Sequence, residues 1–250
     1  MTVSIEPLHC GTLTAANSMF EVDGGDDPVL LPVPSWLIRH PGGVVLFDTG
    51  MHQELTAPGP LLDMASLFFD VGIDSDSLVR ARLAERQVDA ADVDIVVLSH
   101  LHFDHAGGLS QLPNARVLVQ EAEWAAGFDD ELTATNSYIK GDYDLGHDVV
   151  KVNGEHDIFG DGALTCLPTP GHTPGHQSLQ VQLANETIVL CGDCAYFDRT
   201  LRGGALPPIG HDLDQQRESI GRLVGLGEAG ARLIAGHDAE GFAALPAKLT

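Results

Sequence analysis

The most informative stretch of this 250-residue chain for its fold is Ser99-His100-Leu101-His102-Phe103-Asp104-His105-Ala106-Gly107-Gly108. It places three histidines and one carboxylate directly after an apolar run of Ile, Val and Leu. Side chains two positions apart on an extended strand point the same way, so we expect His100 and His102 to hold one metal ion together. Asp104 and His105 follow where the chain turns, and we expect them to face a second metal position nearby.

Four further segments repeat the pattern of a short apolar run that ends in polar residues. With the stretch above, the five segments cover residues 44–48, 95–100, 164–172, 188–193 and 233–237. Runs rich in Val and Ile and bounded by Gly or Pro predict buried strands. If the strand ends share one edge of the sheets, the polar side chains that follow them meet in one site.

Segments with helical spacing lie between these strands, at residues 75–88, 121–128 and 212–227. Strands and helices interleave along the chain without a Ser- or Pro-rich linker, which predicts an α/β fold with one domain over residues 1–250. Residues 53–72 form an apolar stretch that contains Pro-Gly-Pro. This stretch predicts either a core helix or a cap over a pocket.

Two metal positions need more ligands than the histidine stretch supplies, and the other strand ends supply them. A catalytic zinc ion takes about three or four nitrogen and oxygen ligands together with water. Asp193 has two carboxylate oxygens, so it is suited to bridge two metals. The expected ligands are His100, His102 and His172 for the first ion, Asp104, His105 and His237 for the second, and Asp193 as the bridge.

The chain is strongly acidic, with 36 Asp and Glu against 13 Lys and Arg and a formal net charge of -23. Such a surface repels nucleic acid and anionic membranes, because clustered Lys and Arg carry that kind of binding. No apolar run approaches the length of a membrane span, and the first residues resemble no secretion signal, so we expect a cytoplasmic protein. Four cysteines do not indicate a disulfide scaffold in a chain of this size. Both a monomer and a homodimer are compatible with the sequence.

These motifs resemble a known family. The run 100–108, the sequence Pro-Gly-His-Thr-Pro-Gly-His-Gln-Ser at 170–178, Asp193 at its strand end and Gly-His-Asp at 236–238 resemble the metallo-β-lactamase superfamily. Within it, they are most similar to the N-acyl homoserine lactonases, and the resemblance covers nearly the whole chain. It implies an αβ/βα sandwich of two mixed sheets flanked by helices, with two Zn²⁺ per chain at one edge of the sheets.

Two residues narrow the subgroup that the chain resembles. His102 stands where flavodiiron-type members carry Glu, which favours hydrolysis over electron transfer. Asp193 stands where the related zinc β-lactamases carry Cys. The resemblance therefore implies a quorum-quenching lactonase that opens the ring of N-acyl homoserine lactones, small neutral substrates, by attack of a metal-bound hydroxide. Another lactone, a glyoxalase II-like thioester and a phosphodiester are the alternative substrates within this fold.

The resemblance also points to residues that act beyond metal binding. Tyr196 matches a tyrosine that these lactonases place near the substrate carbonyl, and we expect it to donate a hydrogen bond to the developing oxyanion. Asp104 is expected to carry a proton from the nucleophile to the ring oxygen. The candidates for an acyl pocket are Met19, Phe20, Phe68 and Phe69.

Overall fold

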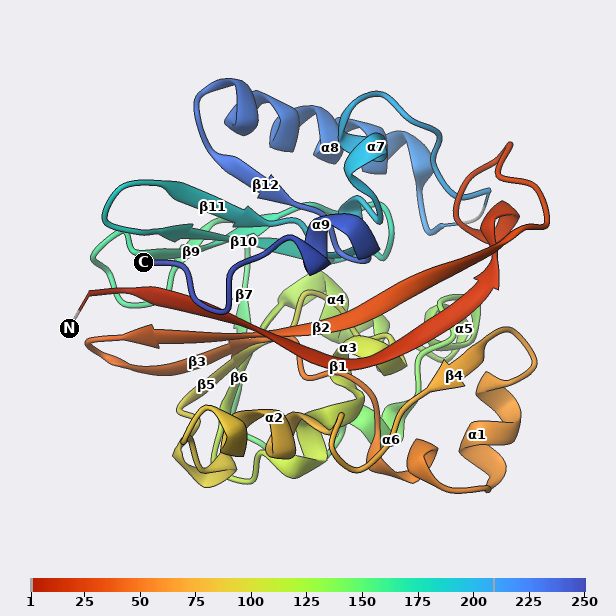
Figure 1. The fold of residues 1–250 in the computed structure, drawn as a ribbon, viewed down its shortest axis with the longest axis horizontal. Coiled ribbons are helices and arrows are strands. Elements are labelled where there is room, and N and C mark those ends of the chain that lie inside the picture. The colour runs from red at the N-terminus through yellow and green to blue at the C-terminus, as the bar shows by residue number, and fades with distance from the viewer. Residues whose placement is uncertain (1, 209) are drawn as a thin grey trace.

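Two mixed β-sheets pack face to face in the computed structural model, which describes residues 2–208 and 210–250 (Figure 1). The seven-stranded sheet consists of β1 (Ser4–Ala16), β2 (Pro28–His40), β3 (Gly43–Phe47), β4 (Asp70–Gly72), β5 (Ile95–Val97), β6 (Arg116–Gln120) and β7 (Val149–Val152). The five-stranded sheet consists of β8 (His156–Asp157), β9 (Leu164–Pro168), β10 (Gln177–Gln182), β11 (Thr187–Leu190) and β12 (Arg232–Ile234).

The strand orders are β4-β1-β2-β3-β5-β6-β7 and β12-β11-β10-β9-β8. Neighbouring strands from β3 through β5 and β6 to β7 are parallel, as are β11 and β12, and the other pairs are antiparallel. Both sheets are therefore mixed. The predicted αβ/βα sandwich is confirmed, and each of the five predicted strands is present.

Helix α8 covers the outer face of the five-stranded sheet and α2 that of the seven-stranded sheet, whereas α9 packs through Phe242 on the core between the two sheets (Figure 1). The α-helices are α1 (Pro60–Ala65), α2 (Val79–Glu85), α3 (Phe103–Ala106), α4 (Glu121–Ala126), α5 (Asp130–Thr135), α6 (Lys140–Tyr143), α7 (Asp198–Leu201), α8 (Leu213–Glu228) and α9 (Ala239–Ala243). Short 3₁₀ helices are η1 (Asn17–Met19), η2 (Gln53–Thr56), η3 (Ala90–Asp92), η4 (Gly107–Gln111) and η5 (Gly192–Cys194). Within residues 2–208 and 210–250, no helix is long and apolar enough to cross a membrane.

Both faces of each sheet are buried, because successive residues of a strand enter different cores. In β5, Val96 packs with helices α2 and α4 on the outer face, whereas Val97 lies in the core between the two sheets. In β11, Val189 packs towards α8 while Leu190 lies between the sheets. This double burial explains why β5 and β11 are nearly continuous apolar runs and not alternating ones.

The predicted helices are present, with different ends. The third begins as expected, because the Asp212 carboxylate accepts hydrogen bonds from the amides of Asp214 and Gln215 at the start of α8. The first begins at Val79 and not at residue 75. There the Asp74 carboxylate accepts hydrogen bonds from both the amide and the hydroxyl of Ser77, which holds a turn in place of the first helical turn.

Residues 53–72 do not form a core helix, which was one of the two predictions for this apolar segment. They fold into η2, the short helix α1 and the edge strand β4. Leu67 and Phe68, just after α1, are 75% and 63% exposed. The alternative reading of this segment as a cap over a pocket stays a prediction.

Gly108 gives a test of how tightly the metal-binding stretch packs on the sheet. A Cβ atom at this position would lie 2.1 Å from the carbonyl oxygen of Thr49, a backbone atom that cannot move away cheaply. We expect Gly108→Ala to lower the free energy of unfolding by about 1–3 kcal/mol in urea denaturation. Gly221→Ala is the control, since a Cβ there meets nothing within 4 Å on helix α8 and should stabilise by about 0.5–1 kcal/mol. Equal effects of the two substitutions would contradict this packing.

Candidate metal centre

The seven predicted metal ligands lie together at the ends of strands from both sheets. They come from the loops that follow β5, β9, β11 and β12, and from the short helix α3. Their ligand atoms form two groups, and within each group the atoms lie within 4.8 Å of one another. We call the group His100, His102, His172 and Asp193 the first cluster, and the group Asp104, His105 and His237 the second cluster.

In the first cluster, three imidazole nitrogens converge on one point. His102 Nδ1 lies 2.9 Å from His100 Nε2 and 3.1 Å from His172 Nε2, and the last two atoms are 3.3 Å apart. Burial, with other histidines close by, holds the pKa of His100 and of His172 well below its usual value. Neutral imidazoles present lone pairs, which is the form that binds a metal ion.

The ring tautomers of three histidines follow from their outer hydrogen bonds. His102 Nε2 donates to the Asn136 carbonyl at 2.8 Å, and His237 Nδ1 donates to the Pro32 carbonyl at 2.8 Å. A carbonyl only accepts, so in a metal-bound ring the opposite nitrogen would carry the lone pair and face its cluster. His105 Nδ1 lies 2.9 Å from a carboxylate oxygen of Asp48, which directs His105 Nε2 inward in the same way.

Asp193 belongs to the first cluster and also faces the second. Its Oδ1 is 3.2 Å from His105 Nε2 and 2.9 Å from His237 Nε2, both in the second cluster. Its Oδ2 is 3.4 Å from His172 Nε2 in the first cluster. Burial raises the pKa of Asp193, but His105 and His237 outweigh this effect and hold it well below its usual range. Asp193 is therefore a carboxylate that offers one oxygen to each cluster.

Buried polar atoms in the two clusters lack hydrogen-bond partners, and bound metal ions would satisfy them. Asp193 Oδ1 and His105 Nε2 are buried and close, yet neither has a hydrogen-bond partner among residues 2–208 and 210–250. Buried polar atoms without partners are costly, and a cation that accepts their lone pairs removes that cost. Imidazole and carboxylate are ligands that suit Zn²⁺. The donor set thus matches two divalent cations.

Comparison with known proteins agrees with this geometry. The family model described as "Metallo-beta-lactamase superfamily" matches residues 28–237. The chain belongs to the metallo-β-lactamase superfamily. It is 36% identical to an N-acyl homoserine lactonase, AttM, from Rhizobium radiobacter, with 94% of this chain and 93% of that protein covered. An N-acyl homoserine lactonase from Bacillus thuringiensis is 30% identical, with 84% and 82% covered.

A solved structure of an N-acyl homoserine lactone hydrolase has the same fold. It superposes with a TM-score of 0.86 at 25% identity, and the match covers 98% of each chain. That hydrolase holds the product N-hexanoyl-L-homoserine at its catalytic metal centre.

Asp48 supports the second cluster in this member of the superfamily. The residue directly follows β3 and has a positive φ of 60°, a conformation that costs free energy outside glycine. Its carboxylate accepts hydrogen bonds from the Ser99 amide at 2.7 Å and the Ser99 hydroxyl at 2.8 Å, as well as contacting His105. Asp48 thereby joins the end of β3 to the start of the histidine stretch.

Tyr196 lies beside both clusters. Its ring stacks on His237 with centroids 5.5 Å apart, and it lies 5.6 Å from the ring of His172. Burial and the nearby carboxylates of Asp193 and Asp104 raise its pKa well above the usual value. Tyr196 therefore keeps its proton and remains a hydrogen-bond donor at neutral pH.

Three of the four candidate pocket residues pack in the same apolar cluster as Tyr196. Phe20 is buried, with its ring 5.4 Å from that of Tyr196, and the half-buried Met19 and Phe69 join it. Phe103, within the histidine stretch, lies 5.9 Å from Phe69 and extends the apolar cluster. Phe68 is instead exposed. The assignment of these side chains to an acyl pocket stays a prediction.

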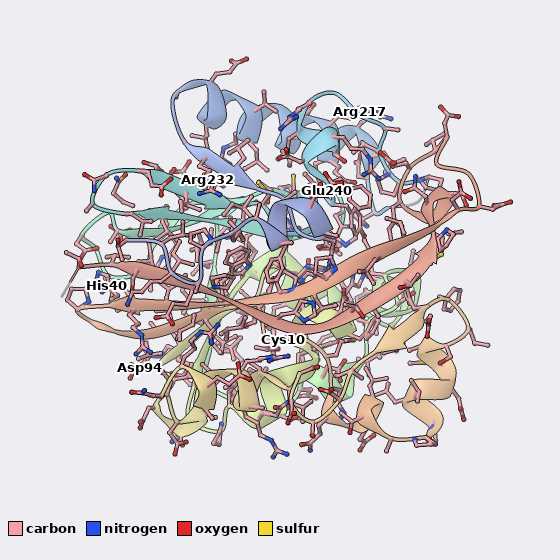
Figure 2. All side chains as sticks on the ribbon, viewed as in Figure 1. Cys10, His40, Asp94, Arg217, Arg232 and Glu240 are labelled. Carbon is pink, nitrogen blue, oxygen red and sulfur yellow. The ribbon has the colours of Figure 1, made fainter. Side chains whose placement is uncertain are left out.

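Other buried polar residues hold the clusters in place. His176 accepts a hydrogen bond from the Asp193 amide at 3.0 Å, and Gln216 on α8 donates to the carbonyls of Asp193 and Cys194. His40, by contrast, lies at the end of β2 and contacts Asp161 at 3.0 Å; Figure 2 shows it at the same end of the molecule as Asp94, which directly precedes β5. The supporting roles of Asp48 and Gln216 had no distinctive signal in the sequence beyond the position of Asp48 after a strand.

Proposed function

We propose that this protein is a hydrolase that opens the lactone ring of N-acyl homoserine lactones with two zinc ions per chain. The observation that carries the proposal is Asp193, which offers one carboxylate oxygen to each of two buried ligand clusters beside the protonated Tyr196. The relatives named as N-acyl homoserine lactonases, which match nearly the whole chain, support the choice of substrate.

We assign the metal ligands from the same geometry. His100, His102 and His172 would hold the first ion, Asp104, His105 and His237 would hold the second, and Asp193 would contribute a carboxylate oxygen to each. Two zinc ions supply a hydroxide nucleophile at neutral pH, because a bound metal lowers the pKa of water from about 15.7 to about 7.

The side chains around the ions perform the remaining chemistry. The Tyr196 hydroxyl donates a hydrogen bond to the carbonyl oxygen of the lactone as negative charge develops on it. The Asp104 carboxylate takes the proton released by the nucleophile and returns it to the ring oxygen as the ester bond breaks. The product is an open-chain N-acyl homoserine.

The charge of the protein supports a small neutral substrate. A net charge of -23 disfavours phosphodiesters, nucleic acid and anionic membranes as partners. The four cysteines, Cys10, Cys166, Cys191 and Cys194, are free and buried, which is usual in a reducing compartment and supports a cytoplasmic location. We also propose that residues 1–250 form one hydrolase domain, since both sheets contribute to the site, and that it acts as a monomer or homodimer.

A hydrolysis panel tests this function. We expect the zinc-loaded protein to hydrolyse butanoyl and dodecanoyl homoserine lactones much faster than a plain δ-lactone, a glutathione thioester or a phosphodiester. Exhaustive chelation should remove the activity, and added Zn²⁺ should restore it. Faster hydrolysis of one of the other substrates would refute the proposed substrate and identify the protein as a hydrolase of that compound. Full activity without metal would refute the mechanism.

A further inference from the structure

Glu123 is a buried carboxylate on α4 that belongs to neither ligand cluster. Its two carboxylate oxygens accept four hydrogen bonds. Oε1 accepts from the Leu101 amide at 3.0 Å and the Tyr138 hydroxyl at 2.6 Å. Oε2 accepts from the Thr173 hydroxyl at 2.9 Å and the Gly175 amide at 2.9 Å. A charged carboxylate with two oxygens satisfies this set, whereas an amide would turn an N–H towards donors.

Three of the four donors belong to two loops that carry metal ligands from different sheets. Leu101 lies between His100 and His102, in the loop after β5 of the seven-stranded sheet. Thr173 directly follows His172, in the loop after β9 of the five-stranded sheet. One carboxylate therefore fixes the distance between the loops that bring these three histidines to the first cluster.

Tyr138 connects Glu123 to the hydrogen bond that orients the ring of His102. Two residues before it, the Asn136 carbonyl accepts the hydrogen bond from His102 Nε2. Ser137, between the two, has a φ of 57°, so the backbone is held in a strained conformation there. Glu123 anchors one end of this segment through the Tyr138 hydroxyl, and the segment orients the ring of His102.

His172 depends on its loop more than the other histidines do. His102, His105 and His237 each have an outer ring nitrogen that contacts an oxygen acceptor. His172 Nδ1 has no hydrogen-bond partner in the described parts of the chain. The loop is also held close to α4, because a Cβ on Gly175 would lie 2.1 Å from the Glu123 amide nitrogen. Backbone anchors must therefore set the direction of the His172 ring.

We propose that Glu123 is a positioning residue that sets the metal affinity of the first cluster while leaving the second cluster unaffected. The inference rests on the ligand assignment proposed above. The second cluster has its own supports, since His105 contacts Asp48 and His237 donates to Pro32. Substitution of residues that orient metal ligands typically lowers metal affinity by about 10- to 100-fold.

Zinc titration of the metal-free protein, in competition with a chromophoric chelator, tests the proposal. For Glu123→Gln we expect one of two binding steps to weaken by about 10- to 100-fold while the other keeps its affinity. Glu121→Gln, the same change at an exposed position on the same helix, should leave both steps unchanged. His237→Ala, which removes a ligand proposed for the second cluster alone, should weaken the opposite step, and this identifies the step that belongs to each cluster.

Three results would overturn the proposal: unchanged affinity in Glu123→Gln, equal weakening of both steps, or weakening of the step that His237→Ala also affects. If Glu123→Gln does not fold, Tyr138→Phe and Thr173→Val each remove one donor and should weaken the same single step by a smaller factor. Unchanged affinities in both of these variants would equally refute it. A wild-type protein that binds two zinc ions but hydrolyses no lactone would refute the proposed function and leave this inference standing. Failure to bind two ions would refute both.

Discussion

Asp193→Ala should abolish both stable binding of two metal ions and lactone hydrolysis. The substitution removes the carboxylate whose oxygens face the two clusters, and with it a negative charge that offsets two divalent cations. Loss of one oxyanion-stabilising donor can lower the rate by a factor of about 1000. We expect a larger fall in kcat/KM here, because the nucleophile itself depends on the metals. Metal analysis by mass spectrometry and a lactone hydrolysis assay measure the two effects.

Asp198→Ala is the matched control for this experiment. Asp198 lies five positions further along the chain, and its half-exposed side chain pairs with Arg202 on the surface. Exposed ion pairs contribute little, so this variant should keep its metal content and its activity. Near-normal hydrolysis by Asp193→Ala would show that the bridging assignment is wrong.

Tyr196→Phe should lower kcat by about 10- to 1000-fold while the protein keeps two metal ions. The hydroxyl stays protonated because burial and the Asp193 and Asp104 carboxylates raise the pKa of Tyr196, so it donates a hydrogen bond at neutral pH. The phenyl ring retains the stacking against His237 and the tilted contact with Phe20, so the fold and the metal ligands should be undisturbed.

Tyr143→Phe separates this effect from the general loss of a buried hydroxyl. Tyr143 is fully buried and donates to the Gly127 carbonyl at 2.7 Å, which belongs to neither cluster. Its substitution should cost about 0.5–1.5 kcal/mol of stability and leave kcat unchanged. If Tyr196→Phe turned over lactone at the wild-type rate, Tyr196 would be a packing residue and not a catalytic one.

The strand ends were predictable because their signal is local. A buried run such as Ile188–Leu190 is readable from a few neighbouring residues, and the polar residue that follows it must lie at a sheet edge. The fold and the convergence of the seven candidate ligands could therefore be expected from the sequence, with the family resemblance supplying the sandwich architecture. The start of α2 was mispredicted because a local side-chain hydrogen bond from Ser77 to Asp74 replaced the first turn.

The residues that support the clusters were not predictable in this way. The Asp48 carboxylate meets Ser99 and His105, which are 51 and 57 positions away in the chain, and Glu123 meets Gly175 at a separation of 52. Such contacts depend on how the loops fold over one another, which no short pattern encodes. A buried Glu on a short helix looks like an ordinary surface residue until its partners are known.

Because of the position of the first cluster, an ion bound there would raise the stability of the folded protein. Two of its histidines follow the seven-stranded sheet, and His172 and Asp193 follow the five-stranded sheet, so an ion there cross-links the two halves of the sandwich. Ligation that requires the native fold adds about 2.7 kcal/mol of stability when free ligand is at 100 times its dissociation constant. Zinc supply in the cell would then govern how long each molecule survives proteolysis, as well as whether it can work.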